Sequence, residues 1–313
     1  MNDEPPMTPE APRRGAAAAA CPTCEGAFLG PYCHQCGEQR PDPRRDRLIE
    51  YALAPVRAVG SLDGRWLRAL WSLVRRPGAL SAEWARGARV RWPRPWSVFF
   101  FVNVTYYFVA SMVSTGFLKT PLQMHLSGSP WRKDVAARLA QRGFAPEDIE
   151  RLAGLGEGRP SAALSQFAHA FDAHAASVSK LVVVSLVPMF AALLAVAFLR
   201  SGRRLIDHLV LATHFIAWWI GFAVLVSLPL FEALGAAARG AFPGLEWLNG
   251  DAIFVPVELA LATLWLSLAA RRFYGAQSAA WRWARALVLS IGLLGLIVGP
   301  FRRLEFLFAW WTL

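Results

Sequence analysis

The sequence predicts an all-α polytopic membrane protein, with about five transmembrane helices behind a small N-terminal metal-binding ribbon. The 313 residues are 55% hydrophobic and include 14 Trp, which is more apolar than soluble domains of this length. Apolar runs long enough to cross about 30 Å of hydrocarbon recur along the chain. The third observation is the spacing of the cysteines, which predicts the ribbon.

All four cysteines lie in one short segment and form two C-x-x-C knuckles: Cys21, Cys24, Cys33 and Cys36. Knuckles this close together can present four thiolates to one Zn²⁺, and a fully ligated ion leaves no position for water or substrate. We therefore predict a structural zinc ribbon over residues 21–40, with iron or a redox dithiol as the alternatives. Tyr32 is expected to pack over the site, whereas His34 is expected to be exposed.

The compartment follows from the thiols, because zinc thiolate sites persist where thiols stay reduced. The ribbon is therefore expected in the cytoplasm. Residues 1–20 lack the pattern of a cleavable signal peptide and are predicted to form a disordered tail. The formal net charge is +11. Basic residues beside apolar spans favour a bilayer with anionic headgroups as the partner, and no nucleic-acid binding is expected.

Five apolar runs are candidate membrane spans, and together with their connections they make residues 96–313 a helical bundle. The runs are 96–118, 181–199, 208–231, 252–270 and 286–311. Pro300 interrupts the last run, which is either one long kinked helix or a shorter span followed by an interfacial piece.

Basic residues alternate between the connections and so predict the orientation of the bundle. Arginines cluster before the first span, between the second and third, and between the fourth and fifth, whereas the loop 234–250 holds Arg239 alone among basic residues. The N-terminus is therefore expected inside, and the segment 119–180 is expected outside. That segment is predicted to form short amphipathic helices, one beginning at Pro146. A solvated linker is favoured over a lid.

Residues 41–95 are predicted to form a basic amphipathic collar on the membrane surface. Within 62–76, apolar residues recur at helical spacing on one side and arginines on another. The residues expected at the lipid interface are Arg65, Arg68, Arg75, Trp66 and Trp71. Arginines suit lipid phosphates, and tryptophans suit the headgroup boundary. Pro77-Gly78 is predicted to end this helix.

Ionisable or strongly polar residues within the spans are candidates for function by default. They are Asn103, Asp207, His208, His214, Glu258, Arg302 and Glu305. Asp207 and His214 are expected on one helix face, where a proton or metal site shared with Glu258 is conceivable. The favoured interpretation is that these groups join neighbouring helices by buried hydrogen bonds, with Arg302 paired to Glu305 across one turn.

Several blocks of the sequence together resemble a known family. They are GPYCHQCGEQ at 30–39, RPG at 76–78, GAR at 87–89, DHLVLATHF at 207–215 and RFYG at 272–275. Their order resembles an uncharacterised bacterial integral membrane family with an N-terminal zinc ribbon, domain of unknown function 3667. The resemblance implies a multi-pass protein of the bacterial inner membrane and implies no activity. Where the family often carries a second histidine this chain has Ile216, so a paired-histidine metal site is not expected.

Three functional hypotheses fit these observations. The first is a membrane-anchored scaffold or signalling module whose cytoplasmic zinc ribbon docks a protein partner or stabilises an oligomer. The second is a transporter or channel with a polar path through His214, Glu258 and Arg302. A third, a membrane enzyme acting on a lipid or isoprenoid, has less support, because no nucleotide-binding, zinc-protease, serine-hydrolase or kinase motif is present. No catalytic residue is assigned.

Overall fold

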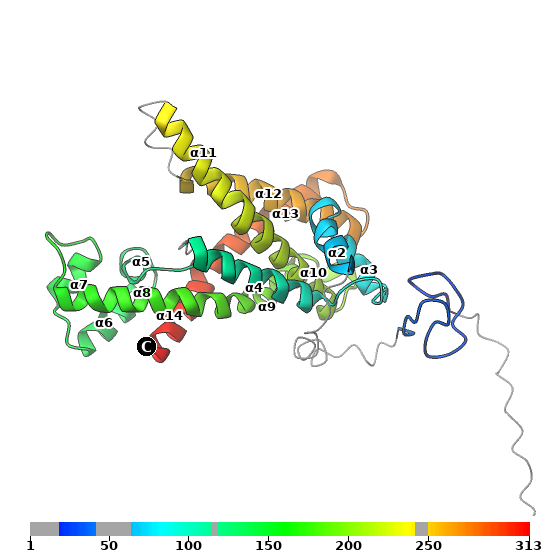
Figure 1. The fold of residues 1–313 in the computed structure, drawn as a ribbon, viewed down its shortest axis with the longest axis horizontal. Helices are drawn as coiled ribbons and strands as arrows, with labels where there is room; N and C mark the ends of the chain where they lie inside the picture. Colours follow the sequence, from blue (N-terminus) through cyan, green and yellow to red (C-terminus); the bar gives the residue numbers. More distant parts are fainter. Residues whose placement is uncertain (1–18, 42–63, 114–117, 242–249) are drawn as a thin grey trace, which may run out of the picture.

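The computed structural model describes residues 19–41, 64–113, 118–241 and 250–313. Over these ranges the protein is helical, and its only extended pairings are two isolated bridges in the ribbon. A bundle of long helices forms the centre, the ribbon lies at one end, and a group of short helices lies at the other (Figure 1). The all-α prediction is confirmed. The predicted tail lies almost wholly outside the described residues, as does the collar segment 42–63.

The helices follow one another along the chain with short connections. They are α2 (Gly64–Arg75), α3 (Ala79–Ala85), α4 (Pro95–Val113), α5 (Leu122–Ser127), α6 (Arg132–Gln141), α7 (Pro146–Leu152), α8 (Ala162–Val182), α9 (Leu186–Ala197), α10 (Leu205–Trp218), α11 (Leu228–Ala241), α12 (Gly250–Phe273), α13 (Ala279–Leu296) and α14 (Arg302–Thr312).

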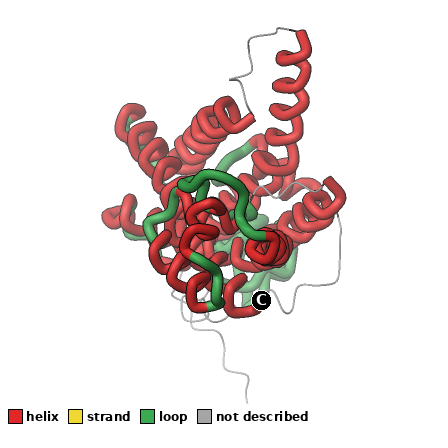
Figure 2. The backbone as a smooth tube through the Cα atoms, turned by 90° about the vertical axis from the view of Figure 1, so that its left-hand side faces the viewer, coloured by secondary structure: helices red, strands yellow, loops and turns green. Residues whose placement is uncertain are grey.

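The centre of the bundle is α10, which packs against α4, α9 and α3. Every residue of α10 after Leu205 is buried except Leu209, which is partly buried. Aromatic rings fill the contacts: Phe215 stacks on Phe190 of α9 with 4.8 Å between ring centroids, and it lies 5.3 Å from Trp265 of α12. Such ring pairs add to the stability gained by burying their area. A view along the bundle shows helices surrounding this core, with α11 extending away from it (Figure 2).

Four helical stretches are long and apolar enough to cross a membrane: Ala162–Ala197, Leu205–Ser227, Phe254–Phe273 and Ala279–Thr312. They contain four of the five expected runs in whole or in large part. The run expected at 96–118 begins with α4, which is not among the four, and its residues 114–117 lie outside the described residues, so its crossing stays a prediction. The chain thus has the helices of a multi-pass membrane protein.

The helix containing the second expected span begins earlier than predicted. Starting at Ala162, it continues through a 3-10 turn at Val183–Ser185 as one stretch of 36 residues. Before Lys180 its exposed residues include the polar Gln166, His169 and Ser177. Beyond Lys180, Leu181 and Val196 are 76% and 65% exposed. The apolar surface therefore starts where the sequence predicts it, while the helix itself starts about five turns earlier.

The segment after α4 folds into a cap, formed by α5, α6, α7, the first half of α8, and α14. α7 begins at Pro146 with two acidic residues in its first turn, as predicted. α14 continues from α13 through a π-helical turn at Ile297–Phe301, which contains Pro300, and it packs on α8. The last expected span is therefore one long helix that reaches the cap. The π turn accommodates the proline, which cannot donate the regular helical hydrogen bond.

Candidate metal centre

The two cysteine knuckles have the same backbone geometry. The N–H of Cys21 donates to the carbonyl of Gly26 and the N–H of Cys33 to that of Glu38, both at 2.7 Å. Each knuckle then turns through one residue in the left-handed region, Glu25 at φ 63° and Gly37 at φ 74°. Glycine adopts this conformation without the penalty that a side chain brings. The ribbon is thus two copies of one tight turn facing each other.

The four sulfurs lie at the spacing of a tetrathiolate metal site. All four Sγ atoms lie within 4.8 Å of one another, with Cys21 3.6 Å from Cys36 and Cys24 3.5 Å from Cys33. These distances are far longer than a disulfide bond of about 2.05 Å. They match the roughly 3.8 Å edge of a tetrahedron built on metal–sulfur bonds of about 2.3 Å. The predicted ligand set therefore fits a metal ion.

The thiols influence one another's pKa: burial and hydrogen bonds among the sulfurs raise the pKa of Cys24 and of Cys36, whereas the surroundings of Cys33 favour its thiolate. Backbone N–H groups of Cys36 and Gln35 lower the pKa of the Cys33 thiol to about 6, and the thiolate is the form that binds metals. Phe28 is buried against Cys21 and Cys33. The expectation that Tyr32 covers the site is wrong, because Tyr32 is 59% exposed and Phe28 takes that place. His34 is exposed, as predicted.

Glu38 holds the ribbon against the collar. Its side chain is buried, and Oε2 accepts hydrogen bonds from the Thr23 hydroxyl at 2.6 Å and from the N–H groups of Arg89 and Val90 at 2.8 and 2.9 Å. A buried carboxylate is stable only when such donors replace water. No role was predicted for Glu38 from the sequence, although an acid directly after a knuckle glycine, ahead of a basic collar, is a signal for such a contact.

The collar helix α2 divides the predicted interface residues between two faces. Trp66 packs on Phe101 of α4 with 5.3 Å between ring centroids, and Arg65 donates to the carbonyl of Val90 at 3.1 Å. Arg68, Trp71 and Arg75 are exposed, and the Arg75 guanidinium lies 5.0 Å from the Trp71 ring. Apolar neighbours share this outer face: Leu67 is 75% and Val74 45% exposed.

After α2, the chain inserts between α10 and α12. Pro77-Gly78 ends α2, as predicted, and Gly78 has φ 77° and so little space that a Cβ would lie 2.7 Å from Cα of Ala269. The Arg272 guanidinium donates to the Pro77 carbonyl at 2.8 Å. At the end of the insertion, Ser81 Oγ hydrogen-bonds His214 Nδ1 at 2.8 Å, with both side chains buried. The collar is therefore anchored inside the bundle, beyond what its amphipathic pattern predicts.

The polar residues of the spans have separate partners. Asp207 accepts from the N–H of Arg204 at 3.0 Å and so caps α10, while His208 Nδ1 lies 2.7 Å from the Tyr274 hydroxyl. Asn103 donates to the carbonyl of Lys180 at 3.3 Å. In the described part of the chain the cysteine cluster is the one group with metal-ligand geometry. A metal site shared by Asp207, His214 and Glu258 is thus not formed among these residues.

Glu305 is paired differently from the expectation. Its carboxylate accepts from the N–H and hydroxyl of Thr120, at 3.1 and 2.7 Å. Arg302 is close enough to act on Glu305 electrostatically. Glu258 is buried in α12 and 7% exposed. His214 and Arg302 thus contact different parts of the chain, Ser81 of α3 and the cap.

Comparison with known proteins supports the resemblance drawn from the sequence. The profile of a family described as "Protein of unknown function (DUF3667)" matches residues 63–107. Neither curated proteins nor solved structures gave a match. The matched segment contains α2, the insertion between α10 and α12, and most of α4. Residues 63–107 therefore carry the sequence pattern of the DUF3667 family, and the resemblance to that family is confirmed.

Proposed function

We propose that the protein is a membrane-anchored scaffold whose N-terminal ribbon binds a structural zinc ion and docks a cytoplasmic protein. The observation that carries the proposal is the contact made by Glu38, which ties the metal site to Arg89 and Val90, a few residues after the helix α3 that is inserted in the bundle. Through this contact the ribbon, folded around its ion, would be held at a fixed position on the membrane domain.

Zinc is the metal that best suits this donor set. Four thiolates in tetrahedral spacing are typical of structural zinc, and they leave no position for a catalytic water. A ribbon of this size has almost no core of its own, so the ion would supply most of its folding free energy. The residues that would hold it are Cys21, Cys24, Cys33 and Cys36.

The outer face of the ribbon supports the docking role. Leu29 is 81% and Tyr32 is 59% exposed, and His34 and Gln35 beside them are also exposed. Exposed apolar side chains rimmed by polar ones are typical of protein-binding surfaces. We define the docking face as Leu29, Tyr32 and His34.

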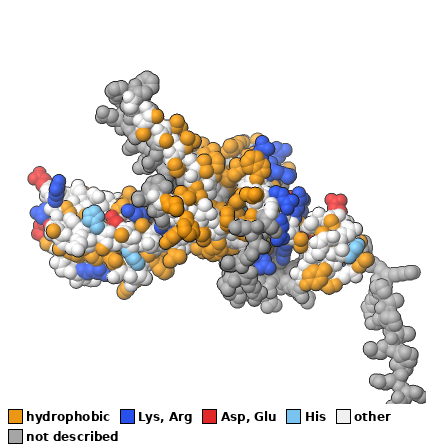
Figure 3. Space-filling model, viewed as in Figure 1, with side chains coloured by type: hydrophobic (Ala, Val, Ile, Leu, Met, Phe, Trp, Pro, Cys, Tyr) orange, Lys and Arg blue, Asp and Glu red, His pale blue; other side chains and the backbone are white. Residues whose placement is uncertain are grey.

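Charge supports a cytoplasmic N-terminus. Arg203 donates to the Phe273 carbonyl at 2.6 Å, and Arg272 to that of Pro77 at 2.8 Å, so three arginine-rich segments share one end of the bundle, next to the ribbon (Figure 3). We call this end the basic end. The positive-inside rule favours the cytoplasm for it. With the bacterial family resemblance, this favours the inner membrane, where Arg68 and Arg75 on the outer face of α2 would contact anionic headgroups.

The proposal is tested by comparing variants of two kinds. Cys24→Ser removes one ligand and should release the zinc and unfold the head, whereas Leu29→Ser with Tyr32→Ser should keep stoichiometric zinc. Crosslinked co-purification from native membranes should recover a protein partner with the intact protein and with neither kind of variant. A partner recovered equally with Leu29→Ser, Tyr32→Ser would exclude the docking face. Stoichiometric zinc in a Cys24→Ser, Cys36→Ser double variant would refute the metal site.

The transport alternative would need His214, Glu258 and Arg302 to share one path. His214 bonds to Ser81 of the inserted segment, and Arg302 faces the Glu305 and Thr120 region of the cap. These partners support a packing role. Flux through proteoliposomes that falls when Glu258 becomes Gln, at unchanged expression, would favour transport instead.

A further inference from the structure

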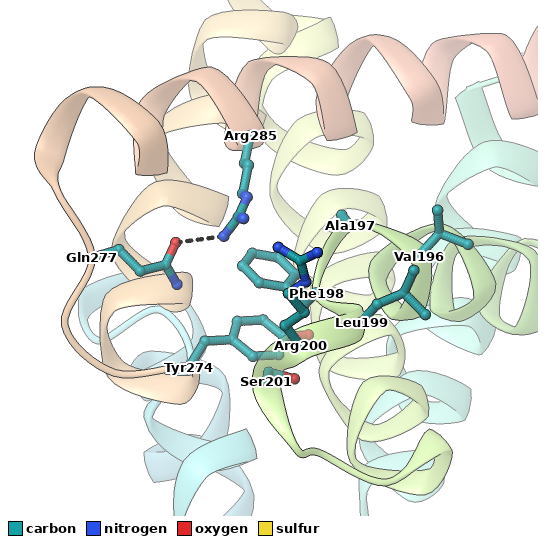
Figure 4. Close-up of a pocket in the computed structure, with 9 residues that line it drawn as sticks. All are labelled: Val196, Ala197, Phe198, Leu199, Arg200, Ser201, Tyr274, Gln277 and Arg285. Atoms are coloured by element: carbon teal, nitrogen blue, oxygen red, sulfur yellow. Dashed lines mark hydrogen bonds between the residues drawn. The ribbon is translucent and has the colours of Figure 1, made fainter.

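A cavity of about 460 Å³ opens at the basic end of the bundle, between the end of α9 and the connection from α12 to α13. Its walls come from segments distant in the sequence. Arg200 and Ser201 follow α9, Tyr274 and Gln277 follow α12, and Arg285 lies on α13. The two arginines reach toward the same space from these different elements (Figure 4).

The cavity is positively charged and holds one of its arginines in place. Arg285 donates to Gln277 Oε1 at 3.1 Å, and its guanidinium lies 5.3 Å from the Phe198 ring and 5.0 Å from that of Trp281. No carboxylate is among the described residues that line the space. Two like charges that converge without an acid repel each other, and an anion between them would relieve that repulsion. The planar guanidinium suits phosphate oxygens in particular.

The cavity also lies at the depth of lipid headgroups. On the α9 side Val196 and Leu199 are 65% and 77% exposed, and on the α13 side Val288 is 64% exposed. All three belong to the apolar surfaces of membrane-crossing helices or directly adjoin them. The arginines lie beside the end of this apolar belt, where a bilayer changes from acyl chains to phosphates.

We infer that this cavity binds the headgroup phosphate of an anionic phospholipid. Arg200 and Arg285 contact the phosphate oxygens, and Ser201 and Gln277 offer further hydrogen-bond donors. The acyl chains lie along Val196, Leu199 and Val288. The site is distinct from the outward arginines of α2, and it does not depend on a metal at the cysteine cluster.

The experiment uses the full chain, purified in detergent, stripped of lipid and titrated with phosphatidylglycerol, with bound lipid counted by native mass spectrometry. Arg200→Gln with Arg285→Gln should weaken binding at least tenfold, on the order expected for losing two charge-assisted contacts to the phosphate. Arg86→Gln with Arg271→Gln is the matched control, because it removes the same charge from exposed arginines outside the cavity, and it should change binding less than about twofold. Equal losses in the two variants would overturn the site in favour of general attraction to charge. No loss in either would overturn it as well.

Two further arms separate the source of the phosphate and guard against misfolding. Inorganic phosphate should compete only weakly with phosphatidylglycerol, and Val196→Ser with Leu199→Ser should weaken binding of the lipid alone. If inorganic phosphate binds as tightly as the lipid, the ligand of the cavity is free phosphate and the lipid proposal is wrong. If the double arginine variant loses its normal gel-filtration profile, the single variant Arg200→Gln tests the site instead, because Arg200 is exposed and its replacement should not disturb folding. It should weaken binding severalfold relative to Arg271→Gln, and an equal affinity would overturn the inference.

Discussion

At the basic end of the bundle Arg203 and Arg272 donate to backbone carbonyl groups, whereas in the cap Asp172 and Glu305 accept from backbone N–H groups. Arg203 donates to the carbonyl of Phe273, the last residue of α12. In the cap, Asp172 accepts from the N–H of Leu122, the first residue of α5, at 2.8 Å. Helix C-termini leave unpaired carbonyls and helix N-termini leave unpaired N–H groups. Arg203 and Asp172 thus each pair with a backbone group that a helix end leaves open, and Asp207 does the same at the start of α10.

The ribbon lies at the opposite end of the molecule from the cap, and it too is held by a carboxylate that accepts from backbone N–H groups. Glu38 accepts from the N–H groups of Arg89 and Val90, although the surrounding collar is rich in arginine. One carboxylate therefore joins a small metal-dependent unit to a large apolar one. The ribbon and the membrane domain should therefore respond to different perturbations.

Metal removal should have the largest effect, and only at the ribbon. Structural zinc sites contribute about 10 kcal/mol or more of apparent binding free energy at neutral pH. A high-affinity chelator should therefore abolish hydrogen-exchange protection in residues 21–40 and weaken it at the contact with Arg89. Protection in the cap should not change. Protection that survives in a demonstrably metal-free ribbon would show that the head folds without the ion.

The inserted segment of the collar should be the next most sensitive point. Gly78→Ala places a Cβ 2.7 Å from Cα of Ala269 at φ +77°, and backbone cannot move away cheaply. We expect a loss of about 3 kcal/mol or more, from overpacking added to backbone strain. Gly202→Ala is the matched control, because Gly202 has φ +68° and open space around it.

Gly202→Ala should lower stability by only about 1 kcal/mol. Thermal unfolding in detergent measures both variants. Equal losses would mean that strain alone acts at Gly78 and that the insertion is not tightly packed.

The metal-binding ribbon and the inserted segment at Gly78 show what the sequence could and could not predict. The cysteine ligands and the alternation of arginines depend on local spacing, so they could be predicted without knowing the fold. The insertion depends on Gly78 meeting Ala269, and no periodicity signals a contact so distant in the sequence. The continuity of α8 with α9 was also not predicted, because the first half of α8 is polar. Its buried face packs within the cap, and the mixed charges of residues 119–180 did not predict that packing.

The cap should depend on Glu305. Glu305→Leu leaves the N–H and hydroxyl of Thr120 buried without their acceptor, a loss of about 2–3 kcal/mol. Glu147→Leu is the control, because Glu147 is exposed in the first turn of α7 and should change stability by about 0.5 kcal/mol or less. Hydrogen exchange should rise across the cap while the ribbon keeps its protection. An unchanged cap would place the stabilisation of this end elsewhere.

Acid should loosen the cap through His125. Burial lowers the pKa of this histidine to about 4, with Arg302 and Arg303 acting in the same direction, whereas an unfolded histidine titrates near about 6.5. The folded cap thus binds fewer protons than the unfolded chain between these values. Its stability is complete above about pH 6.5 and falls on the order of 2 kcal/mol as the pH drops toward 4.

His125→Gln should remove this part of the pH dependence, because Gln can still accept from Trp131, which donates to His125 Nδ1 at 3.3 Å. His169→Gln, at an exposed position on α8, serves as the control. Melting temperatures between pH 7 and pH 4 measure the difference. A slope that is the same in His125→Gln and the intact protein would assign the acid response to other groups.

The smallest expected effect tests the joint between ribbon and collar. Glu38→Gln keeps the shape of the side chain but replaces charge-assisted hydrogen bonds to Arg89 and Val90 by neutral ones, a loss of about 1–2 kcal/mol. Because none of the cysteines changes, zinc should stay bound while exchange at the Arg89 and Val90 amides rises. If the amides stay protected, the ribbon is held by other contacts. If zinc is lost instead, Glu38 supports the metal site itself, and the ribbon forms one cooperative unit with the collar residues that it contacts.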